Sequence, residues 1–382
     1  MHYTKLLLSL TFITYSYSFS INTFTFNLNR RELLQISGVS LIPSFSSQSK
    51  PICVIGANGE TGRECIKLLA ENKTRIRAVS RKPINFKDLG LDTGFEKYIE
   101  SMQIDIKEKT NINDIIKGTS SVIFLANAKK KYRYFKNDAE QFQNYEDIDI
   151  LALKNIAESC ISNNIPRLVY VSGSCKSCAA DPTSQIDKIC GIECDNCRSK
   201  QSGENIIRDL YKDVNHIDYT IVRIGYLING ENRGAKEIEI NQDFTKSGMI
   251  SRTDLANICI NSIYNKQTAR TTFEAYYRDT TQPYDVRDSL QMCTNMGKSI
   301  EECFFGSEYK DKKPESMEEV RKKPIKGSLF TTGHEFQGEN WNNLFQDIKK
   351  DNNNPFLIDD KNNEKTLDEN DNLEDIMPIQ TI

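Results

Sequence analysis

The chain has 382 residues, 11 cysteines and a formal net charge of −3. This length is sufficient for one large α/β domain with an appendage. A hydrophobic fraction of 38% is low, so we expect part of the chain to lie outside a packed core. Binding to nucleic-acid phosphates requires a broad excess of basic residues, which 50 Lys and Arg against 53 Asp and Glu do not supply.

Residues 1–48 have the composition of a targeting presequence. Lys5 precedes an apolar run at 6–15, and small residues after that run predict cleavage before Phe19. The run is too short to span a bilayer, so it indicates a signal peptide rather than an anchor. No later segment is apolar and long enough to cross a membrane, and we expect none in the mature chain.

The next part of the presequence has a different character. Residues 19–31 contain no acidic residue and end in Arg30 and Arg31, which is typical of a transit peptide. The arginine pair before the mildly apolar stretch 35–43 also fits a twin-arginine signal. The two leaders together resemble the bipartite plastid presequence of algae with secondary plastids. We therefore expect a plastid protein, in either the stroma or the thylakoid lumen.

Three glycines at three-residue spacing follow the first strand-like run, 52–55. A helix-like stretch, 63–72, comes directly after them. Gly56 permits a sharp turn, Gly59 lets the backbone approach phosphates, and Gly62 lets the helix pack closely on the strand. The N-terminus of the helix adds unpaired N–H groups and a positive dipole end. This order of elements predicts binding of a nucleotide diphosphate.

Strand-like and helix-like segments alternate regularly after residue 50. The expected strands are 52–55, 75–80, 102–106, 121–126, 167–172, 218–224 and 271–277, and the expected helices are 61–72, 111–117, 144–163, 200–212 and 252–264. Such alternation predicts an α/β fold in which a doubly wound parallel sheet, a Rossmann domain, spans residues 49–280.

The remaining residues differ in composition. Residues 281–350 predict a small C-terminal unit that packs on the sheet domain, with helix candidates at 284–296, at 315–322 and from Trp341 onward. Residues 351–382 are rich in Asn, Asp and Glu, which is the composition of a disordered acidic tail.

The choice of cofactor follows from the charge after the second strand. In dinucleotide-binding folds an acidic residue about 20 positions after the glycines binds the ribose of NAD. Residues 73–87 contain no Asp or Glu, and the strand ends in Ser80, Arg81 and Lys82. Arg81 suits a 2′-phosphate, which favours NADP over NAD. A basic surface loop without such a role is the alternative.

Several further motifs occur in the order that one protein family shows. They are the three glycines, Ser80-Arg81, 122–126 (VIFLA), 153–155 (LKN), 167–172 (RLVYVS), 219–223 (YTIVR) and 250–256 (ISRTDLA). With them the chain resembles the atypical short-chain dehydrogenases/reductases, in the NmrA-like NAD(P)H-binding branch, over residues 51–280.

The resemblance implies roles for particular residues. Arg81 would contact the 2′-phosphate, and Lys200 would hydrogen-bond the nicotinamide ribose and be the catalytic candidate. The full set of implied cofactor contacts is Gly56, Asn58, Gly59, Glu60, Thr61 and Gly62 at the diphosphate, Arg81, Asp105 and Ile106 at the adenosine, and Ala126, Asn127, Ser172 and Lys200 at the nicotinamide side.

Two positions depart from the family pattern. Reductases of the superfamily place a tyrosine four residues before the lysine, because hydride delivery to a carbonyl must be matched by a proton. This chain has Asn196 there, and an amide is not such a donor. Ile224 also replaces the proline expected after Arg223.

Five cysteines lie where that tyrosine is expected: Cys175, Cys178, Cys190, Cys194 and Cys197. Two Cys-x-x-Cys pairs fit a structural zinc site with four sulfur ligands. The same pairs also fit disulfides or thiol exchange, and inert thiols are a third alternative. In each case the segment would form a lid over the nicotinamide end of the cofactor.

Two functional hypotheses follow. One is an NADPH-dependent enzyme that reduces or isomerises a small plastid metabolite. The other is a non-catalytic NADPH-binding redox sensor or photosynthetic assembly factor, with a thylakoid-associated protein as its partner. A purely structural zinc protein would leave the glycine turn without a role.

Overall fold

The computed structural model describes residues 17–21, 24–28, 49–91, 93–128, 145–174, 194–242, 246–283, 297, 299 and 335–353. The chain divides into two compact units, Met1–Pro43 and Ser44–Ile382. In the first unit, β1 (Tyr17–Ile21) and β2 (Phe24–Leu28) pair antiparallel. The predicted cleavage point before Phe19 falls inside β1, and the targeting role of this unit stays a prediction.

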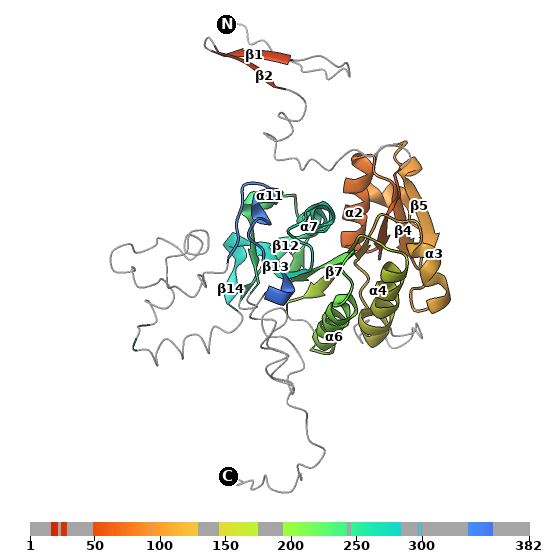
Figure 1. Cartoon of the computed structure of the whole chain (residues 1–382). Coiled ribbons are helices and arrows are strands. Elements are labelled where there is room, and N and C mark those ends of the chain that lie inside the picture. Colours follow the sequence, from red (N-terminus) through yellow and green to blue (C-terminus); the bar gives the residue numbers. More distant parts are fainter. Residues whose placement is uncertain are drawn as a thin grey trace, which may run out of the picture. The chain divides into compact units, whose positions relative to one another are not determined.

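An eight-stranded sheet forms the centre of the second unit (Figure 1). Its order is β5 (Ile99–Gln103), β4 (Ile76–Ser80), β3 (Ile52–Ile55), β6 (Ser121–Phe124), β7 (Arg167–Gly173), β8 (Asp218–Ile224), β13 (Thr271–Tyr277) and β10 (Ile238–Asn241). Every neighbouring pair is parallel except β10 with β13. The chain order reverses at β3, which confirms the predicted doubly wound fold and places a ligand crevice there.

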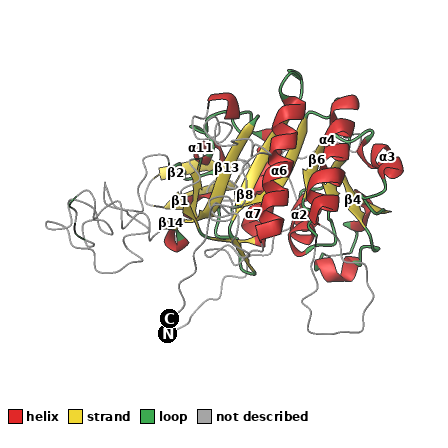
Figure 2. Cartoon of the chain, turned by 90° about the horizontal axis from the view of Figure 1, so that it is seen from below, coloured by secondary structure: helices red, strands yellow, loops and turns green. Residues whose placement is uncertain are grey.

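Helices cover both faces of this sheet. On one face α2 (Glu60–Glu71) packs against α7 (Arg252–Tyr264). On the other face α3 (Ile112–Ile116), α4 (Leu153–Ser162) and α6 (Cys194–Tyr211) lie in a row, and Figure 2 shows α4 beside α6. A π-helical segment, η4 (Asp147–Ala152), leads into α4.

The burial pattern explains why these segments form these elements. All four residues of β3 are buried, as expected for a strand that is covered by helices on both sides. In α2 the buried residues Cys65, Ile66, Leu69 and Ala70 recur at the spacing of one helical face. The apolar periodicity therefore specifies both layers of the domain.

Strand β5 and helix α6 begin several residues before their predicted starts. Strand β5 occupies Ile99–Gln103 instead of 102–106. The apolar residue Ile106 was predicted to lie in the strand, but it is buried in the segment that follows the strand end. Helix α6 begins at Cys194, six residues before the predicted start at Lys200. The cysteine pair thus forms the first turn of the helix that carries Lys200.

The described C-terminal residues 335–353 pack on the sheet. Phe336 bridges to Ile240 of the edge strand β10, and the short helix α11 (Trp341–Leu344) buries Trp341. The predicted helices at 284–296 and 315–322 lie outside the described residues.

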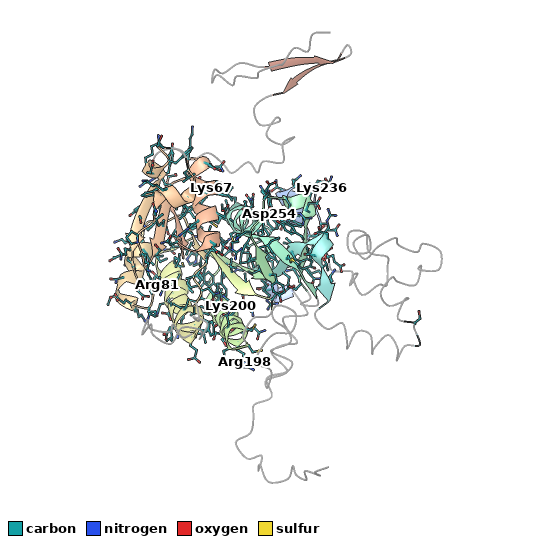
Figure 3. All side chains as sticks on the ribbon, turned by 180° about the vertical axis from the view of Figure 1, so that it is seen from behind. Lys67, Arg81, Arg198, Lys200, Lys236 and Asp254 are labelled. Atoms are coloured by element: carbon teal, nitrogen blue, oxygen red, sulfur yellow. The ribbon has the colours of Figure 1, made fainter. Side chains whose placement is uncertain are left out.

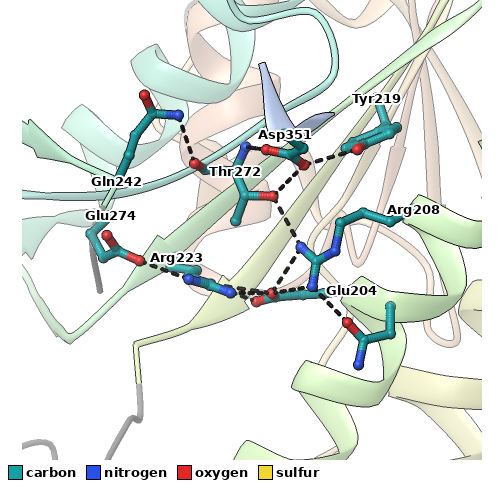
Figure 4. Close-up of polar contacts among 9 residues, drawn as sticks. Glu204, Arg208, Tyr219, Arg223, Gln242, Thr272, Glu274 and Asp351 are labelled. Carbon is teal, nitrogen blue, oxygen red and sulfur yellow. Dashed lines mark hydrogen bonds and ion pairs between the residues drawn. The ribbon is translucent and has the colours of Figure 1, made fainter. Parts of the chain in front are cut away.

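Asp351 corrects the predicted start of the acidic tail. This residue is 7% exposed and accepts hydrogen bonds from the backbone N–H of Thr272 at 2.6 Å and from the hydroxyl of Tyr219 at 2.8 Å (Figure 4). Composition alone could not indicate this, because an aspartate in an Asn- and Asp-rich stretch looks solvated. The tail beyond residue 353 lies outside the described residues.

Candidate functional site

The glycine turn has the geometry that its sequence predicts. Gly56 has φ +88°, and a Cβ atom there would lie 2.7 Å from the backbone nitrogen of Ala126. A Cβ atom on Gly62 would lie 2.3 Å from the carbonyl oxygen of Gly56. Helix α2 starts after Gly59 without a side-chain cap, so its first N–H groups remain available to an anion. The turn therefore forms a cradle for phosphate that larger residues would fill.

A cavity of about 940 Å³ opens beside this turn, at the carboxyl ends of β3, β4, β6, β7 and β8. Its wall contains all thirteen of the predicted cofactor positions: Gly56, Asn58, Gly59, Glu60, Thr61, Gly62, Arg81, Asp105, Ile106, Ala126, Asn127, Ser172 and Lys200. These residues come from six separate segments of the sequence. The fold thus brings the whole predicted set to one cavity.

Polar contacts shape the part of this cavity that is expected to hold the diphosphate and the adenosine. The amide of Asn58 donates to the carbonyl oxygen of Pro83 at 3.2 Å and accepts from Arg63 at 3.1 Å. Glu60 pairs with Arg252 at 2.7 Å. Arg81 is exposed directly after β4, and Figure 3 labels it together with Lys200. Its position fits the sequence-based expectation for a 2′-phosphate.

Lys200 lies in the other half, where its ammonium is held inside the protein. Its Nζ lies 3.0 Å from Oδ1 of Asp149, and Asp149 is fully buried. The Nζ atom also lies 5.6 Å from the ring centroid of Tyr170. Burial, together with the charge of Asp149, raises the pKa of Tyr170, so this phenol stays protonated. Asp149 is a residue that the sequence analysis missed.

The position of Asp149 depends on an irregularity of the backbone. It lies in the π-helical segment η4, and such segments are frequent at functional sites. Helix α6 approaches η4 closely because Gly203 has no side chain: a Cβ atom there would lie 2.3 Å from the carbonyl oxygen of Asp149. No local sequence motif marks this contact between residues 54 positions apart.

Three buried oxygen atoms in this half have no hydrogen-bond partner among the described residues. They are Oδ2 of Asp149, Oγ of Ser172 and Oδ1 of Asn196. Ser172 and Asn196 line the cavity. A buried polar atom without a partner is costly, and a bound ligand would satisfy it. These two atoms and the glycine cradle fit a nicotinamide dinucleotide.

A buried ionic network fixes α6 to the sheet below the cavity (Figure 4). Arg223 of β8 lies between two carboxylates, 2.7 Å from Glu204 and 3.0 Å from Glu274. Arg208 lies 3.3 Å from Glu204. Burial opposes the charge of Glu204, but Arg223 and Arg208 outweigh it and hold the pKa of this carboxyl below its usual value. The network thereby orients the helix that carries Lys200.

The cysteine cluster is described only in part. Cys194 and Cys197 are both buried and disulfide-bonded, whereas Cys175, Cys178 and Cys190 lie outside the described residues. A disulfide sulfur is not a thiolate ligand, so these two residues do not support the zinc alternative. Within the described ranges, no group of three or more potential ligands could hold a metal ion. Among the three alternatives, the structure therefore favours disulfide bonding for Cys194 and Cys197.

The sheet order and glycine turn define a dinucleotide-binding Rossmann domain. A family model described as NAD(P)H-binding matches residues 56–266, so the chain belongs to that NAD(P)H-binding family. Short-chain dehydrogenase/reductase family 42E member 1 of Xenopus laevis is 33% identical over 133 residues. That match covers 34% of this chain and 31% of the relative, about a third of each.

Solved structures are more distant in sequence. A putative NAD-dependent epimerase/dehydratase from Bacillus halodurans is 18% identical with a TM-score of 0.44, over 62% of this chain and 97% of that one. The enzyme WbmH of Bordetella bronchiseptica, in complex with NAD⁺, is 14% identical with a TM-score of 0.41, over 65% and 83%. Among the described helices, none is long and apolar enough to cross a membrane.

Proposed function

We propose that the protein binds NADP(H) in the 940 Å³ cavity and reduces or isomerises a small metabolite there. The observation that carries this proposal is the convergence of all thirteen expected cofactor positions on one cavity wall. The preference for NADP rests on Arg81 and Lys82, both exposed directly after β4 where an NAD-binding protein has an acidic residue.

Each half of the site has a separate task in this proposal. The N–H groups after Gly59 and the side chain of Arg81 hold the phosphates. Asp149 fixes the ammonium of Lys200, which hydrogen-bonds the nicotinamide ribose. Ser172 and Asn196 offer the two unpartnered oxygen atoms to the nicotinamide and the substrate. The bound cofactor supplies or accepts the hydride, and the matching proton is exchanged with water, because Asn196 is not a proton donor.

The test of this proposal has two stages. The purified protein is titrated with NADPH and NADH by calorimetry, and NADPH oxidation is then followed with a panel of uncharged carbonyl compounds and quinones. We expect tighter binding of NADPH and turnover of at least one compound. If the protein binds neither NADPH nor NADH, the proposal is contradicted.

A second candidate function is a non-catalytic NADPH-binding redox sensor or assembly factor. Two observations favour it: Asn196 stands where the superfamily has its proton-donating tyrosine, and disulfide-bonded Cys194 and Cys197 form the first turn of the Lys200 helix. A sensor would bind NADPH without turnover, and its affinity would change when the disulfides are reduced. Turnover that is lost in Lys200→Ala would contradict this candidate.

For the location we propose the plastid, on the basis of residues 1–48. The proposal is tested by fusing this segment to a fluorescent protein in an alga with a secondary plastid. Plastid fluorescence that is lost on substitution of Phe19 would support it, and retention of the fusion in the cytosol would contradict it.

A further inference from the structure

Three large hydrophobic side chains are exposed among the described residues: Leu151, Tyr226 and Met249. Two of them are neighbours, because β9 (Tyr226–Ile228) pairs parallel with β12 (Met249–Ser251), and Tyr226 is opposite Met249 in the register. Their exposed fractions are 43% and 42%. Two exposed apolar residues at one place form a patch, whereas a single one such as Leu151 needs no explanation.

This patch lies at the rim of the cofactor cavity. Tyr226 is part of the cavity wall, between Gly225 and Leu227, and Ser172, Asn196 and Lys200 belong to the same wall. Ser172 lies near the carboxyl end of β7, Asn196 and Lys200 lie in α6, and Tyr226 follows β8. The patch therefore borders the nicotinamide half, where a substrate must reach the cofactor.

The backbone below the patch is fixed. The N–H group of Tyr226 donates to the carbonyl oxygen of Gly248 at 3.1 Å, and the N–H group of Met249 donates to the hydroxyl of Thr280 at 2.8 Å. A Cβ atom on Gly225 would lie 2.3 Å from Oγ of Ser247. The two side chains thus stand on a rigid strand pair, so the patch is preformed.

The charges at this end are compensated within the protein. The ammonium of Lys200 is paired with Asp149 at 3.0 Å, and Arg252 is paired with Glu60 at 2.7 Å. The other cationic residues of the described cavity wall, Arg63, Arg81, Lys82 and Lys107, belong to the glycine turn and the adenosine half. An anionic substrate would find no unpaired cation on the described wall near Tyr226, whereas an apolar body with one polar group fits it.

We infer that the site takes an uncharged substrate with an aromatic or alicyclic body, which packs on Tyr226 and Met249. Its one polar group is either a carbonyl that accepts from the hydroxyl of Ser172 or a hydroxyl that donates to Oδ1 of Asn196. This inference rests on the proposed function, because it assigns the substrate class of the same cavity. Tyr226 is then the residue that determines specificity. Sugar nucleotides, which carry a charged diphosphate, are expected to bind more weakly than such a substrate.

The test uses 2-naphthaldehyde as an uncharged aromatic carbonyl probe and UDP-glucose as an anionic one. Their affinities for the NADP⁺-loaded protein are measured by calorimetry. We expect 2-naphthaldehyde to bind more tightly, and Tyr226→Ala to weaken it by about tenfold, because stacking and ring burial are lost. Tyr226→Phe keeps the ring and retains the affinity, and Met249→Ala gives a smaller loss.

Leu151→Ala is the matched control, since Leu151 is exposed but does not line the cavity. It should leave the affinity for 2-naphthaldehyde unchanged. Tighter binding of UDP-glucose, or equal affinities in the wild type and Tyr226→Ala, would overturn the inference. So would a dimer that Met249→Ala dissociates while the affinity stays constant, because the patch would then be an interface between two copies.

The affinity for NADP⁺ is measured first in every variant, together with thermal stability. If the wild type binds no NADP⁺, the proposed function fails. The affinities of the unloaded variants for 2-naphthaldehyde then still test whether Tyr226 binds an aromatic ligand. If NADP⁺ binds and 2-naphthaldehyde does not, the substrate inference alone is overturned.

Discussion

Lys200 Nζ lies 3.0 Å from Asp149 Oδ1 in the interior, where the Lys200 side chain is 9% exposed and that of Asp149 is 0% exposed. Two charges in such a place are costly to bury, and their mutual attraction and hydrogen bond must offset that cost. The pair connects η4 with α6 and fixes the side chain that faces the nicotinamide half of the cavity. It therefore couples the stability of the fold to the geometry of the site.

Asp149→Asn should destabilise the protein by about 3–5 kcal/mol, because Lys200 is left as an uncompensated buried charge. The measurement is the free energy of unfolding in denaturant. The matched control is Glu158→Gln, which removes the partner of Lys154 in an exposed pair at 4.0 Å and should change stability by less than about 0.5 kcal/mol. Equal effects of both substitutions would show that the buried pair has no special role.

Arg81→Ala should weaken NADPH binding by about tenfold or more and leave NADH binding almost unchanged. The substitution removes the charged partner of the 2′-phosphate, and NADH has no 2′-phosphate. Calorimetric titration with both cofactors checks this. Lys67→Ala, on α2 and outside the cavity wall, removes the same charge as a control. Parallel losses for NADPH and NADH would refute the role assigned to Arg81.

Gly62→Ala should disturb the glycine turn, because the new Cβ atom would lie 2.3 Å from the carbonyl oxygen of Gly56. We expect a loss of about 1–3 kcal/mol in stability and a strong loss of dinucleotide affinity. Gly230→Ala is the control, since the nearest atom to its Cβ would be Ser251 Cβ at 3.9 Å. Dinucleotide binding that survives Gly62→Ala unchanged would contradict the assigned cradle.

Glu204 should make the protein less stable in acid. Burial opposes its charge, but Arg223 and Arg208 lower its pKa below the usual 4.5 in the folded state. A depressed carboxyl pKa gives stability that is complete above the unfolded value and is lost as the pH falls through the folded value. Burial raises the pKa of Asp351, so the stability contributed by this carboxyl changes with pH in the opposite direction to that of Glu204.

The measurement is the free energy of unfolding as a function of pH below neutrality, for the wild type and Glu204→Gln. The variant should be less stable at neutral pH, and the difference should shrink as the pH falls below about 4.5. A difference that stays constant down to the acid range would mean that the carboxylate charge of Glu204 does not stabilise the network.

The cysteines that the structure describes should fall into two reactivity classes. Cys53, Cys65, Cys160 and Cys259 are free but buried, and burial raises the pKa of Cys53 to about 12, so they should resist alkylation in the native protein. Cys194 and Cys197 should be alkylated only after reduction of their disulfides. Peptide mapping after alkylation with and without reductant checks this, and labelling of Cys194 without reductant would contradict it.

The sequence predicted the parts of the site that depend on local backbone chemistry. The glycine turn, the end of β4 at Ser80, the residues after β6 and Ser172 near the end of β7 were all found where the parallel-sheet pattern placed them. Strand β5 was displaced because Ile106 is buried outside any strand, and apolarity alone does not separate the two cases. The sheet topology could be predicted because each buried strand carries its own apolar signal.

The residues that were missed act through contacts distant in sequence. Asp149 contacts Lys200 because a π-helical segment and Gly203 let two helices approach each other. Neither the π-helical segment nor the role of Gly203 can be predicted from the local sequence. Tyr226 and Met249 become neighbours through the β9–β12 pairing of two very short strands. Asp351 is buried because Thr272 and Tyr219 supply its partners, which composition cannot show.

The central claim, that NADP(H) occupies this cavity in the assigned direction, is tested most directly by a crystal structure with NADPH bound. We expect the diphosphate at the N–H groups after Gly59, the 2′-phosphate within hydrogen-bond distance of Arg81, and the nicotinamide beside Ser172 and Asn196. A cofactor bound in the reverse direction, a 2′-phosphate without contact to Arg81, or an empty cavity at saturating NADPH would contradict it.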